Sequence, residues 1–492
     1  MSYTYDRLSA QDHSFLVFEE PGLYMHVSGT QIFELGPLEA RGGGVDYERV
    51  RDFIESVLHR IPRYRQKLAW IPIEDRPVWI DDADFDLGYH VRHTSLPQPG
   101  TEAQLRKLAA RVMAQHLDRE RPLWEIWVVE GLENDRFAMI SKVHHCMIDG
   151  SSGVDVSMIL QSPDPDATEV EAPPPFVPRP TPTSRDLLTD AVWHRLGAPF
   201  RALRGWQSFR DEAEDLGDEI RVRAKAIADM YSSQMSAASD TPINGDIGPH
   251  RVFDWWTIPL DRVKEVRRAL DCTVNDLVLT VVTGAFRDYF LHRRVDPGRL
   301  DFRVQTPVSM RSEEEKGKLG NCISAWVVPL PLGEEDPLRQ LAEIHETTQS
   351  LKESRQALGV EMMMSVMEGL PPALLTLAAR GASTGVNSIV TNVPGPQFPL
   401  YLLGAKLLNM YPQVPLLKNV GLGIALLSYN GNMGWGFNAD LGRVPDLRDF
   451  VAYVESSFER VAKIALQDAP KPRTKAKPQA GTKAKDERRA GA

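Results

Sequence analysis

The residues best suited to chemistry form one short motif, HHCMIDG at 144–150, which follows a β-rich segment and runs into a Gly/Ser turn. A neutral imidazole can take a proton from a hydroxyl near pH 7 and later return it to a leaving group. Because side chains alternate along a strand, only one of two adjacent histidines can easily face a given cleft. An HHxxxDG match is expected by chance on the order of one time in a thousand, which favours a general-base site over two ordinary histidines at a strand end. Asp149, followed by Gly150, could fix the loop through backbone bonds or an arginine partner.

Two other interpretations of the chemistry are weaker. Two histidines and an aspartate could ligate zinc or iron, but the chain has no HExxH, no HxH and no paired cysteines. The pentapeptide GASTG at 381–385 matches the GxSxG motif of serine hydrolases, which needs a strand before it and a helix after it. Here a helix-like segment precedes it and a β-rich segment follows, so we reject a lipase site.

The first third of the chain, which must position the histidines, mixes strands and helices. Residues 123–130 (LWEIWVVE) and 137–144 (FAMISKVH) are β-rich and separated by the polar turn GLENDR. We expect them to be neighbouring strands, with the histidine motif at the end of the second. Residues 24–34 favour another strand, and 47–58 and 105–117 have the apolar spacing of amphipathic helices.

The composition changes twice after this region. Residues 162–184 carry eight prolines, typical of an extended linker or surface arm, and residues 185–231 favour a helix. A second mixed α/β region follows, and the basic, low-complexity tail is expected to be disordered. We predict an N-terminal domain at 1–161, a Pro-rich arm and helical crossover at 162–250, a C-terminal domain at 251–467 and a disordered tail at 468–492.

Charge and cysteine content exclude several classes of protein. Against 67 Asp and Glu the chain has 57 Lys and Arg, and the net charge of −10 argues against a general nucleic-acid binder. Three cysteines, Cys146, Cys272 and Cys322, offer no disulfide framework and indicate a reducing, cytosolic compartment. We expect no export signal, and the two long uncharged stretches contain too much Pro, Gly and Asn to span a bilayer.

Further motifs follow in order along the chain. They are PLW at Pro122, Leu123 and Trp124, TVNDLVL around Asn275 and Asp276, PVSMR ending at Arg311, LGN at 319–321, NVPGP from Asn392 and SYNG at 428–431. Taken alone, Asn-Asp is a common helix-start pair and NVPGP a tight turn, and PLW fits packing at a strand entrance.

As an ordered series, with HHxxxDG and the opening LSAQDHSFLVFE from Leu8, these motifs resemble those of the bacterial wax ester synthase/diacylglycerol acyltransferase family. HHxxxDG is the signature of the wider coenzyme A-dependent acyltransferase superfamily. The resemblance covers roughly residues 8–467. Two departures stand out. Cys146 replaces a common alanine and could sensitise the site to thiol reagents, and the plant motif DFGWG survives only as MGWG at 433–436, to which we assign no role.

The resemblance implies an α/β fold of two chloramphenicol-acetyltransferase-like domains, with mixed sheets flanked by helices and an active-site tunnel at the domain interface. It implies that His145 is the general base and that His144 is supportive. Asn275 is our candidate for the donor that stabilises the oxyanion. Asp149 would hold the loop against an arginine, and Arg303 and Arg311 are both plausible partners.

The implied reaction moves a long acyl chain from acyl-coenzyme A, as co-substrate, to diacylglycerol, a fatty alcohol or both. It needs no covalent acyl-enzyme, metal or permanently bound cofactor. The alternatives are an acyltransferase of the same fold acting on another hydroxyl or amine, and a catalytically silent lipid-binding homologue.

Lipid substrates predict peripheral contact with the cytosolic face of a membrane or with lipid inclusions, in the cytoplasm. The segment 193–210 combines an apolar helical face with four arginines, which suits an interfacial helix or an inter-domain helix about equally. No nucleic-acid partner is expected.

Overall fold

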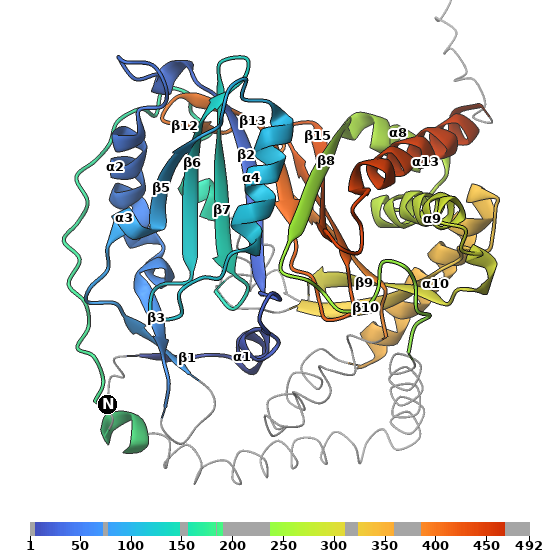
Figure 1. Cartoon of the computed structure of the whole chain (residues 1–492), viewed down its shortest axis with the longest axis horizontal. Helices are drawn as coiled ribbons and strands as arrows, with labels where there is room; N and C mark the ends of the chain where they lie inside the picture. The colour runs from blue at the N-terminus through green and yellow to red at the C-terminus, as the bar shows by residue number, and fades with distance from the viewer. Residues whose placement is uncertain are drawn as a thin grey trace, which may run out of the picture.

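The computed structural model describes residues 5–71, 77–147, 156–183, 185–189, 237–309, 323–358 and 385–467. Two six-stranded sheets, each with helices beside it, form the two halves of the molecule, and a small three-stranded sheet lies near the N-terminus (Figure 1). This mixed α/β architecture is the predicted fold class.

The N-terminal sheet has the strand order β12-β13-β2-β7-β6-β5. β5 runs parallel to β6, and all other neighbours are antiparallel. The strands are β2 (His26–Glu34), β5 (Val91–Ser95), β6 (Trp124–Leu132), β7 (Arg136–His144), β12 (Tyr401–Leu402) and β13 (Ala405–Gln413). The predicted pair of neighbouring strands is therefore confirmed as β6 and β7. Asn134 and Asp135 form the turn between them with positive φ, a conformation that these residue types tolerate.

Helices cover both faces of this sheet. In Figure 1, α2 (Tyr47–Val57) and α3 (Leu87–His90) lie on the side away from the C-terminal half, and α4 (Glu102–Ala114) lies on the side facing it. α4 starts three residues earlier than the periodicity predicts because Thr101 and Gln104 form a capping box at its N-terminus. The short 3-10 turns η1 (Gly36–Leu38), η2 (Leu58–Arg60) and η3 (Pro62–Arg65) connect the elements on the α2 side.

The C-terminal sheet has the order β10-β9-β11-β14-β15-β8. Its strands are β8 (Arg251–Pro259), β9 (Phe302–Ser309), β10 (Ile323–Leu330), β11 (Ser388–Pro394), β14 (Leu422–Tyr429) and β15 (Asn432–Asp440). α8 (Leu260–Ala269), α9 (Val274–His292), the turn η4 (Pro297–Arg299), α10 (Pro337–Leu358) and α13 (Leu447–Gln467) complete this half. α9 is apolar on nearly every face, since it is packed between the sheet, α10 and α13.

Two strands from the predicted C-terminal domain belong to the N-terminal sheet. β12 and β13 come from the predicted C-terminal domain at 251–467 but are strands of the N-terminal sheet, where β13 pairs with β2. β13 also lies against β15 of the other sheet. A Cβ at Gly434 would lie 2.3 Å from the carbonyl oxygen of Met410, and one at Gly436 would lie 1.8 Å from that of Pro412. The glycines of MGWG, to which the sequence assigned no role, thus let the two sheets approach each other.

The third sheet has the order β1-β4-β3 and comprises β1 (Asp6–Arg7), β3 (Gln66–Ala69) and β4 (Val78–Asp81). The Pro-rich arm is extended through residue 183, and its Arg179 side chain is hydrogen-bonded to Asp81 at 2.9 and 3.1 Å. Residues 185–189 are helical, and the rest of the predicted helix at 185–231, including 193–210, lies outside the described residues.

No single helix in the described ranges is both long enough and apolar enough to cross a membrane. Within the same ranges, α8 and α9 taken together meet those requirements, and they are bent by 94° at their junction.

Candidate active site

The paired histidines are held where β7 leaves the sheet. β7 lies between β2 and β6, and the backbone N–H of His144 donates to the carbonyl oxygen of Leu123 at 2.9 Å. On the other side, the N–H of His145 donates to the carbonyl oxygen of Met25 at 2.7 Å. Both backbone positions are thus fixed by the neighbouring strand ends. The motif is described as far as Met147, so Asp149 and Gly150 lie outside the described residues.

The two histidines have different surroundings, as strand alternation predicts. His144 is buried, its Nδ1 accepts the backbone N–H of Cys146 at 3.1 Å, and its Nε2 lies 3.0 Å from Oε1 of Glu19. Since Nδ1 is the acceptor, we assign the ring proton to Nε2, facing the carboxylate. Nδ1 of His144 therefore accepts a hydrogen bond, and Nε2 lies beside the Glu19 carboxylate.

His145 is half-buried and its ring is stacked on Phe15, with ring centroids 4.0 Å apart and an angle of 14° between the planes. Phe15 belongs to α1 (Ala10–Val17), whose N-cap Ser9 accepts the N–H of Asp12 at 2.9 Å. The sequence LSAQDHSF therefore supplies a capped helix that covers one face of the imidazole.

Glu19, which the sequence did not mark as a site residue, links several of these groups. Its side chain is 5% exposed, and it accepts hydrogen bonds from the Met25 N–H at 2.9 Å and from Arg119 Nη2 at 2.6 Å. Burial raises the pKa of Glu19, but the hydrogen bonds and charges of His144, the hydrogen bond from Arg119 and the charge of His26 outweigh burial and lower it to about 2. Glu19 is therefore an ionised carboxylate behind the paired histidines. Nothing in its local sequence spacing indicates this, because two of its partners, Arg119 and His144, lie at least 100 residues away.

Cys146 is a buried, neutral thiol. It is 3% exposed, and burial together with the charges of Asp12 and Glu19 raises the pKa of its thiol well above the ordinary value. Because the thiolate is the reactive form, this environment makes Cys146 unreactive. The expectation that it sensitises the site to thiol reagents is therefore not supported by its surroundings.

The PLW motif packs beneath the histidines. Leu123 and Trp124 are fully buried, the carbonyl oxygen of Pro122 accepts the Trp124 N–H at 2.9 Å, and Trp124 Nε1 donates to the carbonyl oxygen of Tyr64 at 2.8 Å. The backbone carbonyl of Leu123 is also the acceptor for His144. The motif therefore helps to hold the strand end that carries the histidines.

Two motifs far apart in the sequence meet in the C-terminal half. Asn275, exposed on the first turn of α9, accepts a hydrogen bond at its Oδ1 from Nδ2 of Asn392 on β11, at 2.9 Å. This bond orients the Asn275 amide and leaves its own Nδ2 hydrogens available as donors. The sequence order of the ND and NVPGP motifs gives no sign of this contact.

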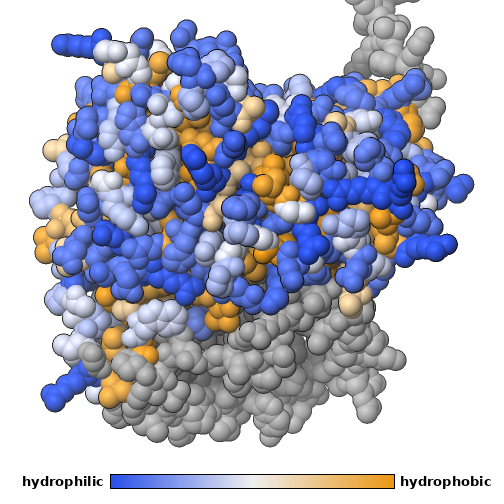
Figure 2. All heavy atoms as spheres, in the orientation of Figure 1, coloured by the Kyte–Doolittle hydropathy of each residue, from blue (hydrophilic) through white to orange (hydrophobic). Residues whose placement is uncertain are grey.

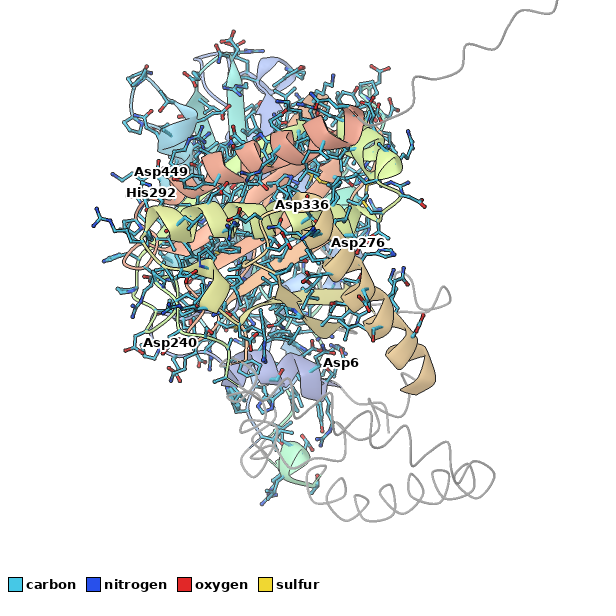
Figure 3. The ribbon with its side chains drawn as sticks, turned by 90° about the vertical axis from the view of Figure 1, so that its right-hand side faces the viewer. Asp6, Asp240, Asp276, His292, Asp336 and Asp449 are labelled. Atoms are coloured by element: carbon cyan, nitrogen blue, oxygen red, sulfur yellow. The ribbon has the colours of Figure 1, made fainter. Side chains whose placement is uncertain are left out.

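Asp276, which follows Asn275, is structural. The N-cap of α9 is Thr273, and Asp276, the third residue of the helix, completes a capping box with it and is not the cap itself. Asp276 also accepts hydrogen bonds from His345 Nδ1 and Thr348 Oγ1 of α10, both at 2.9 Å. Burial raises the pKa of Asp276, but the bonds from His345, Thr273 and Thr348 lower it overall. Figure 3 shows Asp276 at the α10 side of α9.

Of the remaining predicted residues, Arg303 is the one that lies within the described ranges. Arg311 lies outside the described residues, as does Asp149, so their pairing stays a prediction. Arg303 contacts Asp301 through Nε at 2.9 Å and Nη2 at 2.5 Å. Among the described residues, no group of three or more His, Cys, Asp or Glu side chains is arranged to hold a metal ion.

Two family models match most of this chain. The wax ester synthase/diacylglycerol acyltransferase (WS/DGAT) catalytic domain matches residues 8–278, and the WS/DGAT C-terminal domain matches residues 319–462. The chain belongs to the WS/DGAT family. It is therefore an acyltransferase, as its motifs predict. The match of the WS/DGAT catalytic domain runs past the predicted boundary at 250.

Relatives within the WS/DGAT family cover nearly the whole chain. A probable diacylglycerol O-acyltransferase of Mycobacterium tuberculosis, tgs1, is 31% identical over 94% of this chain and 96% of its own length. A second one, tgs2, is 32% identical over 92% of this chain and 98% of its own.

Solved structures share the fold. A WS/DGAT from Marinobacter aquaeolei VT8 has a TM-score of 0.66 at 25% identity, covering 93% of this chain and 99% of that one. The starter condensation domain of rhizomide synthetase has a TM-score of 0.58 at 13% identity, covering 95% of each chain. The second likeness concerns the fold alone and agrees with two chloramphenicol-acetyltransferase-like domains.

Proposed function

We propose that this protein transfers a long acyl chain from acyl-coenzyme A to the hydroxyl of diacylglycerol, of a fatty alcohol, or of both. Membership of the WS/DGAT family supports acyl transfer, and the relatives named as diacylglycerol O-acyltransferases support diacylglycerol as an acceptor. The products are triacylglycerol or a wax ester, together with free coenzyme A.

The observation that carries the mechanism is the difference between the two histidines. His144 is buried, with Nδ1 hydrogen-bonded to Cys146 and Nε2 beside Glu19, whereas His145 is half-buried, with its backbone anchored to Met25 and its ring stacked on Phe15. In the proposed reaction His145 takes the proton of the acceptor hydroxyl as the oxygen attacks the thioester carbonyl. The tetrahedral intermediate then expels the coenzyme A thiolate, which receives that proton from the imidazolium.

Two further features support direct transfer. The Nδ2 group of Asn275, oriented by Asn392, is suited to donate to the oxyanion of the intermediate. Cys146 is neutral and buried, so it is unsuited to form a covalent acyl-enzyme. Asp149 is proposed to hold the motif loop, and no metal takes part in this scheme.

We extend the proposal to the site of action. Acceptors of this kind reside in membranes or lipid inclusions, so peripheral contact with the cytosolic face of a membrane or with an inclusion is proposed for a cytoplasmic protein. Figure 2 shows one face on which hydrophilic residues predominate and hydrophobic residues form small groups among them. The segment 193–210, the interfacial helix considered from the sequence, lies outside the described residues.

The proposal is tested by identifying the lipid product. The purified protein is incubated with palmitoyl-coenzyme A labelled in the acyl chain, and with diacylglycerol, hexadecanol or neither. Labelled triacylglycerol or wax ester, formed only when the matching acceptor is present, supports the proposal, and their ratio gives the preferred acceptor. Labelled free palmitate alone, or no acyl transfer to either acceptor, would overturn it in favour of a hydrolase, a different acceptor or a lipid-binding protein.

A further inference from the structure

The ring of Phe15 makes the closest aromatic stack on the proposed base. The centroids of Phe15 and His145 lie 4.0 Å apart, and the two rings are nearly parallel at 14°. The backbone of His145 is already fixed by its hydrogen bond to Met25. The imidazole turns about two side-chain bonds, and a parallel ring against one face restricts that rotation.

We propose that Phe15 is a positioning residue for acyl transfer, which orients the His145 imidazole and stabilises the imidazolium formed when the acceptor hydroxyl loses its proton. This inference rests on the proposed function, because it takes His145 as the general base. Its subject is Phe15, a residue that reacts with neither substrate.

The stacking geometry directs the reactive edge of the imidazole. Both ring nitrogens lie in the plane of the ring, so an aromatic partner on the face leaves the edges available for hydrogen bonds. When the ring plane is fixed, one nitrogen stays oriented towards the position of the acceptor oxygen. Small deviations from this orientation reduce the rate strongly, because proton transfer needs hydrogen-bond geometry.

The electrostatics of the stack favour the product of proton transfer. The face of an aromatic ring is negative and attracts a cation more than a neutral group. Phe15 therefore stabilises the imidazolium, and with it the transition state, more than it stabilises the resting imidazole. The step is balanced: the proton leaves the hydroxyl, resides on His145 and then moves to the departing thiolate.

Phe15 is held in place independently of the histidine. It packs against the apolar cluster of Leu23, Met25 and Leu416, and Arg119 Nη2 donates to the carbonyl oxygen of Leu16 in the same helix at 3.2 Å. A change at Phe15 therefore leaves α1 anchored. The charged groups that act on the adjacent Cys146 also remain the same; they are Asp12, Glu19, Arg63 and Arg119.

The test compares Phe15→Leu, which removes the ring, with Phe15→Tyr, which keeps it. Phe18→Leu is the matched control, since Phe18 ends the same helix and packs against the same cluster as Phe15. We expect kcat of Phe15→Leu to fall about three- to tenfold, with KM for both substrates within about twofold of the wild type. Because loss of the ring makes His145 harder to protonate, the acid limb of the pH–kcat profile should also move about half a unit to lower pH. Phe15→Tyr and Phe18→Leu should match the wild type in both respects.

Two results would overturn the proposal: an unchanged kcat and pH profile in Phe15→Leu, or an equal loss of kcat in Phe18→Leu with no movement of the acid limb. If Phe15→Leu does not fold, Phe15→Met carries the test, because Met fills irregular space without a ring. The variant His145→Ala distinguishes the role of His145 from the role of Phe15. Full activity in that variant contradicts the proposed function itself, whereas an inactive His145→Ala beside an unchanged Phe15→Leu contradicts only the role of Phe15.

Discussion

Glu19 connects the paired histidines to the rest of the N-terminal half through bonds to Met25, Arg119 and His144. Replacing it with Gln removes the negative charge from a buried set of partners. From the fall in pKa from 4.5 to about 2, we expect Glu19→Gln to lose on the order of 3 kcal/mol of unfolding free energy at pH 7. Urea unfolding of the two proteins measures this difference.

The difference in unfolding free energy between the wild type and Glu19→Gln depends on pH, because folding lowers the pKa of Glu19. A carboxylate whose pKa is lowered on folding stabilises the protein fully above the unfolded pKa, and this stability is lost as the pH falls through the folded pKa. The difference in unfolding free energy between wild type and Glu19→Gln should therefore stay constant down to about pH 4.5 and become smaller below it.

Glu20→Gln is the control. Glu20 is exposed and pairs only with exposed Lys418 among the described residues, so its loss should stay within about 0.5 kcal/mol. A difference between wild type and Glu19→Gln that grows towards low pH would contradict this account.

Among the residues of the candidate site, the paired histidines could be predicted from the sequence and Glu19 could not. HHCMIDG stands out because its residue types and spacing are rare together, and alternation along the strand already predicts different surroundings for His144 and His145. Glu19 does not stand out, because Arg119 and His144 come near it only after folding. The contact between Asn275 and Asn392 was missed for the same reason.

At the level of elements, the helices α4 and α9 both begin with a capping box. α4 starts with a capping box of Thr101 and Gln104, and α9 starts with one of Thr273 and Asp276. Thr101→Ala and Thr273→Ala should each cost about 1 kcal/mol of unfolding free energy. Only Thr273→Ala loosens the turn that carries Asn275, so only this variant should also lower kcat. Equal kcat values in the two variants would count against a role of Asn275 in the reaction.

Elements formed by local pattern could be predicted, and those formed by distant pairing could not. β6, β7 and α2 lie within about two residues of their predicted positions, because alternation and helical periodicity are local properties. The start of α9 was predicted at Asn275 and Asp276 but its cap is Thr273, since Asp276 acts from inside the helix. The pairing of β13 with β2 was not predicted, because strand order depends on pairing across the whole chain.

At the scale of the molecule, β13 joins the two halves by pairing with β2 in one sheet and lying against β15 of the other. Gly436→Ala would place a Cβ 1.8 Å from the carbonyl oxygen of Pro412, a backbone atom that cannot move aside alone. We expect a loss above about 3 kcal/mol of unfolding free energy, seen by urea unfolding or as insoluble protein. Gly42→Ala is the control, because a Cβ at Gly42 meets no atom within 4 Å. Equal stability of the two variants would show that the halves are not joined at this point.

The central claim is that His145 is the base in direct acyl transfer to an alcohol. It is tested most directly by the release of free coenzyme A thiol from palmitoyl-coenzyme A, with and without diacylglycerol or hexadecanol. The wild type, His145→Ala and Cys146→Ala are compared. Cys146→Ala is the control, because the Cys146 thiol next to His145 is neutral and buried. We predict acceptor-dependent release in the wild type and in Cys146→Ala, and a fall of about a hundredfold or more in His145→Ala. Undiminished release in His145→Ala, or loss of release in a folded Cys146→Ala, would contradict the account.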